Sequence, residues 1–163
     1  LIKTAQKVGY DMEVLQAVES VNEKQKSILF NKLMKHFNGD INGKTIAIWG
    51  LAFKPETDDM REAPALVLID KIISVGASVK VYDPIAMPEC KRRIGDKVVY
   101  CKDMYEAVVD VDTLLLVTEW KEFRMPSLEV LNKTMKNKVI IDGRNIYDAK
   151  EMVESGFDYY KIG

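Results

Sequence analysis

From residue 42 onward, short apolar segments alternate with helical segments, and this alternation most restricts what the chain can fold into. Segments 113–118 and 139–142 are apolar almost throughout, which is typical of strands covered on both faces. Strands separated by helices form a parallel sheet. Strands are expected at 44–49, 78–82, 97–101, 113–118, 139–142 and 159–162. The sequence thus predicts an α/β fold with a Rossmann-like, doubly wound parallel sheet of about six strands in the order 3-2-1-4-5-6.

A long helix is expected before the sheet. Apolar residues over 11–38 recur at spacings of three, four and seven, with Asp11 as a candidate N-cap and Gly39 as a stop. Such a helix spans about 40 Å, more than the sheet needs for its cover, so we expect it to bridge two domains or two subunits. The chain therefore divides into a linker or dimerisation helix, 1–40, and a Rossmann-like domain, 41–163.

The composition excludes several classes of function. The formal net charge is −1, which favours neither nucleic acid nor an anionic membrane surface as a partner. No apolar run approaches the ~20 residues that cross a bilayer. Cys90 and Cys101 lack metal-ligand spacing, and His36, the single histidine, is expected to be solvent-exposed on the long helix. We therefore expect no metal site and a reducing cytoplasm as the location.

The loop after the first expected strand occupies the position of a dinucleotide-binding turn. A dinucleotide fingerprint has glycine at the first, third and sixth positions, where this chain has Gly50, Ala52 and Pro55. Ala52 keeps a Cβ where the pyrophosphate needs bare backbone, and Pro55 lacks an N–H donor. The loop instead offers Phe53 and Lys54, so we interpret it as a nucleotide pocket altered for a ligand other than NAD.

Several residues at the ends of predicted strands have two possible roles, one in binding a ligand and one in the structure or at the surface. Lys54 and Arg61 are either ligand-binding cations or solvated surface charges. Asp83 either holds a ribose or starts a turn, and the turn is favoured because Asp83 follows Gly50 by more than the usual ~20 residues. Arg144 either points into the cleft or pairs with Asp148.

For two further groups of residues we prefer a structural role over a ligand-binding one. Asp59 and Glu62 have the spacing of a capping box for the next helix. Trp120 and Phe123 could stack on a base, but core packing is the commoner role of such aromatics. Glu119 could be a general base, although nothing in the sequence raises its pKa. No complete catalytic set is found, so no catalytic residue is assigned.

The loop and the other strand ends resemble a known family. The run from Trp49 through Gly50-Leu51-Ala52-Phe53-Lys54-Pro55-Glu56-Thr57-Asp58-Asp59-Met60-Arg61-Glu62-Ala63-Pro64 is similar to the hallmark of the C-terminal domain of the UDP-glucose/GDP-mannose dehydrogenase family, most of all its UDP-glucose branch. The similarity continues through Val81-Tyr82-Asp83-Pro84, Thr118-Glu119-Trp120 and Asp142-Gly143-Arg144-Asn145, and residues 1–38 resemble the family's central helix.

This resemblance implies a function. Family members oxidise a nucleotide sugar twice at C6 with two NAD⁺, through a thiohemiacetal and a thioester on a cysteine. The resemblance implies that Phe53, Lys54 and Arg144 contact the UDP-sugar and that Arg61 reaches the NAD. It also implies that two copies of the chain form a homodimer through the long helix. The family's glycine-rich NAD domain and cysteine segment have no counterpart here, so we expect a fragment that is inactive alone, with NAD held mainly by the missing half.

Two alternatives stay open. The parent could prefer another nucleotide sugar, such as UDP-N-acetylmannosamine or GDP-mannose, since Thr57 and Trp120 only favour the UDP-glucose branch. The chain could also be a stand-alone nucleotide-binding or dimerisation module with no enzymatic parent. Preferential binding of UDP or of NAD⁺ separates the leading hypothesis from its rivals.

Overall fold

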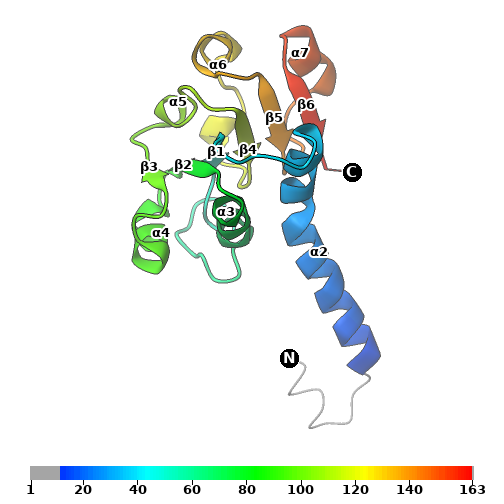
Figure 1. Cartoon of the computed structure of the whole chain (residues 1–163). Helices are drawn as coiled ribbons and strands as arrows, with labels where there is room; N and C mark the ends of the chain where they lie inside the picture. The colour runs from blue at the N-terminus through cyan, green and yellow to red at the C-terminus, as the bar shows by residue number, and fades with distance from the viewer. Residues whose placement is uncertain (1–11, 163) are drawn as a thin grey trace.

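The structure, a computed structural model, describes residues 12–162 and contains a long helix followed in the sequence by a six-stranded, all-parallel sheet (Figure 1). The strand order is β3-β2-β1-β4-β5-β6, as the sequence predicts. The strands are β1 (Thr45–Trp49), β2 (Ser78–Tyr82), β3 (Val99–Tyr100), β4 (Thr113–Leu116), β5 (Val139–Asp142) and β6 (Asp158–Lys161). The helices are α2 (Met12–His36), α3 (Pro64–Ser74), α4 (Met87–Ile94), α5 (Met104–Ala107), the 3₁₀ turn η1 (Lys121–Phe123), α6 (Leu128–Thr134) and α7 (Ala149–Glu154).

Helices cover both faces of the sheet, which confirms the doubly wound prediction. Alternate side chains of β1 point to opposite faces. Ile46 and Ile48 pack into one core with residues of α2, α3 and α4, whereas Ala47 and Trp49 pack into a second core with residues of α5, α6 and α7. Figure 1 shows these two sets of helices on opposite sides of the strands. Burial on both faces explains why the strands are apolar throughout.

Helix α2 contributes its carboxyl-terminal part to the core of the sheet domain. Leu29 and Leu33 are buried in the first core, and the amino-terminal turns extend beyond the body of the domain (Figure 1). The helix ends at His36, two residues earlier than predicted, because Asn38 and Gly39 take left-handed backbone angles, with φ of 55° and 86°. The predicted N-cap, Asp11, lies outside the described residues.

His36 is not the solvent-exposed residue that the sequence predicts. Its Nδ1 shares a 2.7 Å hydrogen bond with the hydroxyl of Tyr160, and its ring packs edge-on against Phe37 and Tyr160 with centroids 4.7 and 5.4 Å away. The prediction failed because β6 lies against the end of α2, a proximity that only the fold creates. The contact ties the last turn of α2 to the last strand.

The predicted strands are confirmed to within a few residues, and β2 and β5 have the predicted bounds. The largest difference is β3, which has two residues where five were expected, since it is the short edge strand of the sheet. Between residues 12 and 162, no helix is both long enough and apolar enough to span a bilayer.

Candidate functional site

The candidate site begins at the sharp turn after β1. Gly50 has a φ of 92°, and its N–H donates to the carbonyl of Tyr82 at 2.9 Å. A Cβ at this position would lie 2.5 Å from both the Cβ and the backbone nitrogen of Thr118. Gly50 thus makes the tight turn after β1, and this position also needs glycine because the residue that follows the carboxyl end of β4 passes close to it.

Asp83, at the end of β2, holds three loops together through one fully buried carboxylate. Its Oδ2 accepts hydrogen bonds from two amides of the loop after β1 and from the indole of Trp120, and its Oδ1 accepts from two amides of its own turn. The donors are Leu51 N (2.7 Å), Ala52 N (3.2 Å), Trp120 Nε1 (3.2 Å), Ile85 N (2.9 Å) and Ala86 N (2.7 Å). The favoured interpretation of Asp83 as a turn residue is confirmed, and the carboxylate also braces the neighbouring loop.

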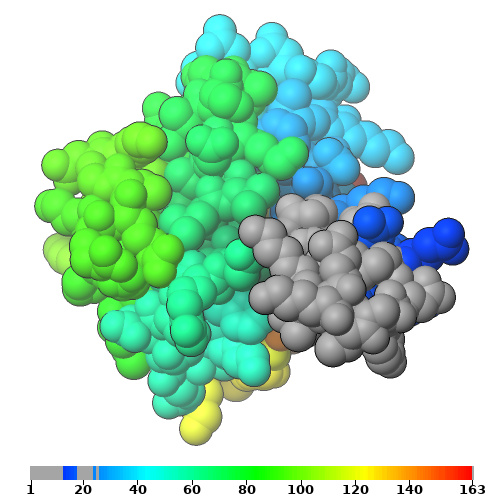
Figure 2. All heavy atoms as spheres, turned by 90° about the horizontal axis from the view of Figure 1, so that it is seen from below, coloured from blue at the N-terminus to red at the C-terminus, as the bar shows by residue number. Residues whose placement is uncertain are grey.

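The backbone of the loop after β1 is fixed at further points, while its two predicted ligand residues are exposed. The hydroxyl of Thr118 donates to the carbonyl of Ala52 at 2.6 Å, and the amide of Phe53 donates to the carbonyl of Asp59 at 2.8 Å. Phe53 is 47% exposed, and the Nζ of Lys54, a residue that is also exposed, lies 5.8 Å from the centre of the Phe53 ring. Figure 2 shows this loop, in cyan-green, on the surface beside α4.

Arg61, the predicted cofactor contact, folds back on its own loop. Its Nε and one terminal nitrogen each donate to the carboxylate of Asp59 at 3.0 Å, and the Arg61 side chain is 80% exposed. These hydrogen bonds hold the pKa of Asp59 at about 2, well below its usual value. The arginine is therefore at the surface and paired within the loop, and its contact with NAD stays a prediction.

The predicted capping box is wrong. Helix α3 begins at Pro64, and its N-cap, Ala63, makes no side-chain hydrogen bond. Asp59 is engaged by Arg61, and Glu62, with a φ of 56°, pairs with Lys26 of α2 at 2.9 Å. Asp59 lies four residues before the N-cap Ala63 and Glu62 directly before it, so neither carboxylate occupies the position that the capping box requires.

Arg144 lies at the end of β5 and pairs with Glu119, not with Asp148. One terminal nitrogen of Arg144 donates to Glu119 Oε1 at 2.7 Å, whereas Asp148 caps α7 by accepting from the amide of Glu151 at 2.8 Å. The Arg144–Asp148 alternative is therefore wrong. The hydrogen bond from Arg144 lowers the pKa of Glu119, which is opposite to what a general base at neutral pH needs.

A second buried carboxylate, which the sequence analysis missed, shapes the turn that carries Arg144. Asp142 accepts hydrogen bonds from three amides of its own turn and from the hydroxyl of Tyr159. The donors are Arg144 N (2.9 Å), Ile146 N (2.9 Å), Tyr147 N (3.1 Å) and Tyr159 Oη (2.7 Å). Asp142 is the last residue of β5 and Asp83 directly follows β2, and an acid at the end of a predicted strand was the signal that could have revealed both roles.

The aromatic and sulfur side chains near the strand ends belong to the core. Phe123 is fully buried and stacks on Trp49 with centroids 5.1 Å apart, and Trp120 is buried against Asp83. The core interpretation of Trp120 and Phe123 is confirmed. Burial likewise raises the pKa of the thiols of Cys90 and Cys101. Within residues 12–162, no three histidine, cysteine or acidic side chains are grouped to hold a metal ion.

Comparison with known proteins places this geometry among relatives. Residues 47–149 match the model of the UDP-glucose/GDP-mannose dehydrogenase family, UDP binding domain. The UDP-glucose 6-dehydrogenase of Pseudomonas aeruginosa is 43% identical over 168 residues, which covers 100% of this chain and 37% of that protein. The UDP-glucose 6-dehydrogenase TuaD of Bacillus subtilis is 42% identical over 163 residues, which covers 100% of this chain and 35% of the relative.

Solved structures show the same fold. The UDP-glucose dehydrogenase of Pyrobaculum islandicum superposes with a TM-score of 0.82 at 28% identity and covers 99% of this chain and 34% of its own. The UDP-D-ManNAc dehydrogenase of Pyrococcus horikoshii has a TM-score of 0.66, also at 28% identity, with 88% and 31% covered. The chain thus spans about a third of the length of the proteins it matches.

Proposed function

We propose, from the premise that this chain belongs to the UDP-glucose/GDP-mannose dehydrogenase family, that it is the UDP-sugar-binding portion of an NAD-dependent UDP-glucose 6-dehydrogenase. The parent enzyme would convert UDP-glucose, two NAD⁺ and water to UDP-glucuronate and two NADH in the cytoplasm. The observation that carries the proposal is the loop after β1, whose backbone is fixed by Asp83 and Thr118 while Phe53 and Lys54 are left exposed.

In this proposal the exposed cations and the ring bind the nucleotide sugar. Lys54 contributes an ammonium group to a phosphate or a uracil carbonyl, and Phe53 contributes an apolar face. Arg144 offers the N–H groups that Glu119 does not use. Arg61 would exchange its pairing with Asp59 for a contact to the cofactor. These roles follow the division into a helical part, 1–40, and a ligand-binding part, 41–163.

The loop does not fit NAD as its main ligand. Ala52 and Pro55 replace two glycines of the dinucleotide fingerprint, and the carboxylate of Asp83 accepts five internal hydrogen bonds. The amino terminus of α3 begins with Pro64, which lacks an N–H, and Glu62 lies two residues before it. The larger part of the NAD site would therefore be formed outside these 163 residues.

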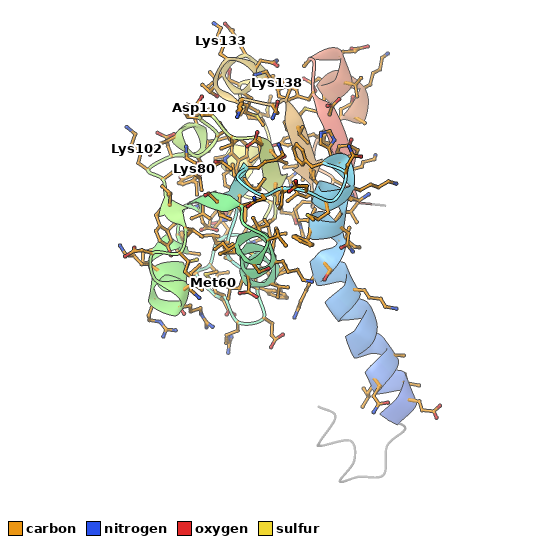
Figure 3. All side chains as sticks on the ribbon, viewed as in Figure 1. Met60, Lys80, Lys102, Asp110, Lys133 and Lys138 are labelled. Atoms are coloured by element: carbon orange, nitrogen blue, oxygen red, sulfur yellow. The ribbon has the colours of Figure 1, made fainter. Side chains whose placement is uncertain are left out.

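The first prediction is that the chain binds UDP and that Lys54→Ala weakens the binding about tenfold or more, because a hydrogen bond to a charged group contributes about 1.5–3 kcal/mol. Calorimetric titration with UDP, UDP-glucose and NAD⁺ measures this. Lys133→Ala is a matched control, since Lys133 lies on the opposite side of the sheet from Met60, a residue of the same loop as Lys54 (Figure 3). Tighter binding of NAD⁺ than of UDP would contradict the proposal.

The same samples are expected to form no NADH from UDP-glucose and NAD⁺, because no catalytic role is assigned to any residue of this chain. Absorbance at the NADH band is the measurement. Turnover by these residues alone would show that the chemistry has been assigned to the wrong part of the enzyme.

We also propose that α2 forms a homodimer with a second copy of the chain. The support is its length of 25 residues and the exposure of Val14 in the turns that extend beyond the sheet. Sedimentation equilibrium is expected to give twice the monomer mass of 18.6 kDa. A monomer at all concentrations would reject this part of the proposal and leave the ligand assignment intact.

The UDP-glucose branch is preferred over the alternatives for one reason. The two relatives quoted at more than 40% identity are both UDP-glucose 6-dehydrogenases, whereas the UDP-D-ManNAc dehydrogenase is 28% identical. A module with no enzymatic parent has no comparable support, because the relatives align over the whole of this chain.

A further inference from the structure

Glu119 lies between two arginines that come from different loops. Its Oε1 accepts from a terminal nitrogen of Arg144 at 2.7 Å, and its Oε2 accepts from a terminal nitrogen of Arg124 at 3.1 Å. The side chain of Glu119 is 28% exposed, and the side chains of Arg144 and Arg124 are 43% and 50% exposed. Each oxygen thus holds one cation, and both cations keep a large part of their surface open to solvent.

The backbones that carry the two arginines are already fixed to each other. The hydroxyl of Tyr147, which follows β5, donates to the carbonyl of Phe123, the residue before Arg124. The amide of Gly143, the residue before Arg144, donates to the carbonyl of Leu116 in β4 at 2.9 Å. Only the long side chains of the arginines are left to be oriented, and Glu119 is the group that holds both.

This cluster adjoins the loop proposed to bind the ligand. Thr118, the residue before Glu119, donates its hydroxyl hydrogen to the carbonyl of Ala52, the residue before Phe53. The backbone segments that carry Glu119 and Phe53 therefore adjoin at the carboxyl edge of the sheet. Two cations and one anion leave a net positive charge there.

We propose that Glu119 is a positioning residue that holds the guanidinium groups of Arg144 and Arg124 side by side to receive the diphosphate of the nucleotide sugar. The proposal rests on the proposed function and adds Arg124 as a second cation of the site. Each arginine spends one N–H on Glu119 and keeps the others, whose planar arrangement matches phosphate oxygens. The lowered pKa of Glu119 keeps its carboxylate charged at neutral pH, so the pairing persists there.

Glu119 could instead compete with the ligand for the arginines, and the geometry argues against this. Without the carboxylate, two like charges on adjacent loops repel each other, and their flexible side chains lose a common anchor. The added positive charge would attract an anion only weakly, because water and salt screen groups that are this exposed. Loss of orientation is therefore the larger effect.

The test is calorimetric titration of Glu119→Gln with UDP-glucose at physiological salt. The Kd is expected to rise about tenfold. Glu129→Gln is the control, because Glu129 makes a 2.7 Å ion pair with Lys133 on α6, and the Kd of this variant should stay within twofold of the wild type. Glu119→Asp, which keeps the charge but shortens the reach, should fall between the wild type and Glu119→Gln.

A double-mutant cycle separates positioning from a merely structural role. If Glu119 acts through the arginines, Glu119→Gln in an Arg144→Ala background should raise the Kd less than threefold. Equal effects in both backgrounds, or tighter binding by Glu119→Gln, would overturn the positioning role even if Lys54→Ala abolishes binding. Absence of UDP-glucose binding in the wild type would instead overturn the proposed function, and the positioning role with it.

Discussion

Asp83→Ala is expected to lower the free energy of unfolding by about 4 kcal/mol, because it leaves five hydrogen-bond donors without their acceptor. Each unsatisfied buried donor costs about 1–3 kcal/mol, and water entering the space left by the carboxylate offsets part of the sum. The loss should be accompanied by release of the loop after β1, since Leu51 and Ala52 depend on this carboxylate. Urea denaturation followed by circular dichroism measures the change.

Asp96→Ala is the control for Asp83→Ala. Asp96 is exposed, and its carboxylate makes a 3.3 Å ion pair with Lys91. Exposed pairs of this kind contribute at most about 1 kcal/mol, so the control should unfold nearly as the wild type does. If the two variants lost equal stability, the buried carboxylate would not be the brace described above.

The second large effect is expected for Gly50→Ala, at about 3 kcal/mol. The added Cβ would lie 2.5 Å from the backbone nitrogen of Thr118, and that backbone belongs to a buried segment that cannot move aside. Overpacking of this kind typically costs about 1–3 kcal/mol, to which the left-handed backbone angle adds about 1 kcal/mol.

Gly39→Ala isolates the backbone part of this effect. Gly39 has a φ of 86°, close to the 92° of Gly50, but a Cβ there would meet nothing within 4 Å. Thermal unfolding of Gly39→Ala should therefore show a loss of only about 1 kcal/mol. A similar loss in both variants would mean that the contact with Thr118 relaxes without difficulty.

The fold was predictable because its strands and helices carry their own signals. Segments 113–118 and 139–142 carry mostly apolar side chains on both faces of the strand. Such strands are typical of a sheet that is covered by helices on both faces. The right-handed crossover rule then gave the strand order. β3 was overestimated because Lys97 and Val98 have the pattern of a strand, but at the edge of the sheet only Val99 and Tyr100 pair with β2.

The sequence predicted where the site lies, but it did not predict which hydrogen bonds and ion pairs its residues make. The strand-end rule located Lys54, Asp83 and Arg144, because the carboxyl ends of parallel strands meet at one edge. Contacts between residues that are far apart in the sequence were missed, at this site and elsewhere in the fold. Glu119 and Arg144 are 25 residues apart, Lys26 and Glu62 are 36 apart, and His36 and Tyr160 are 124 apart.

Local sequence patterns favoured nearby partners instead. The pairing of Arg144 with Asp148 and the capping box of Asp59 and Glu62 both rest on spacings of three or four residues, which are meaningful only inside a helix. These carboxylates lie outside helices or at their caps, so the tertiary fold supplied other partners. Buried carboxylates are similarly hidden, because their function depends on amides that converge only after folding.

In the loop after β1, the atoms that fix the backbone differ from the side chains proposed to bind the ligand, which makes the loop suitable for engineering. Hydrogen bonds of the main-chain amides and carbonyls of residues 50–53 set its shape. The side chains of Phe53 and Lys54 take no part in these hydrogen bonds. A library that randomises only these two side chains should keep its members folded. Selection on such a library could then search for new ligand preferences without first repairing the protein.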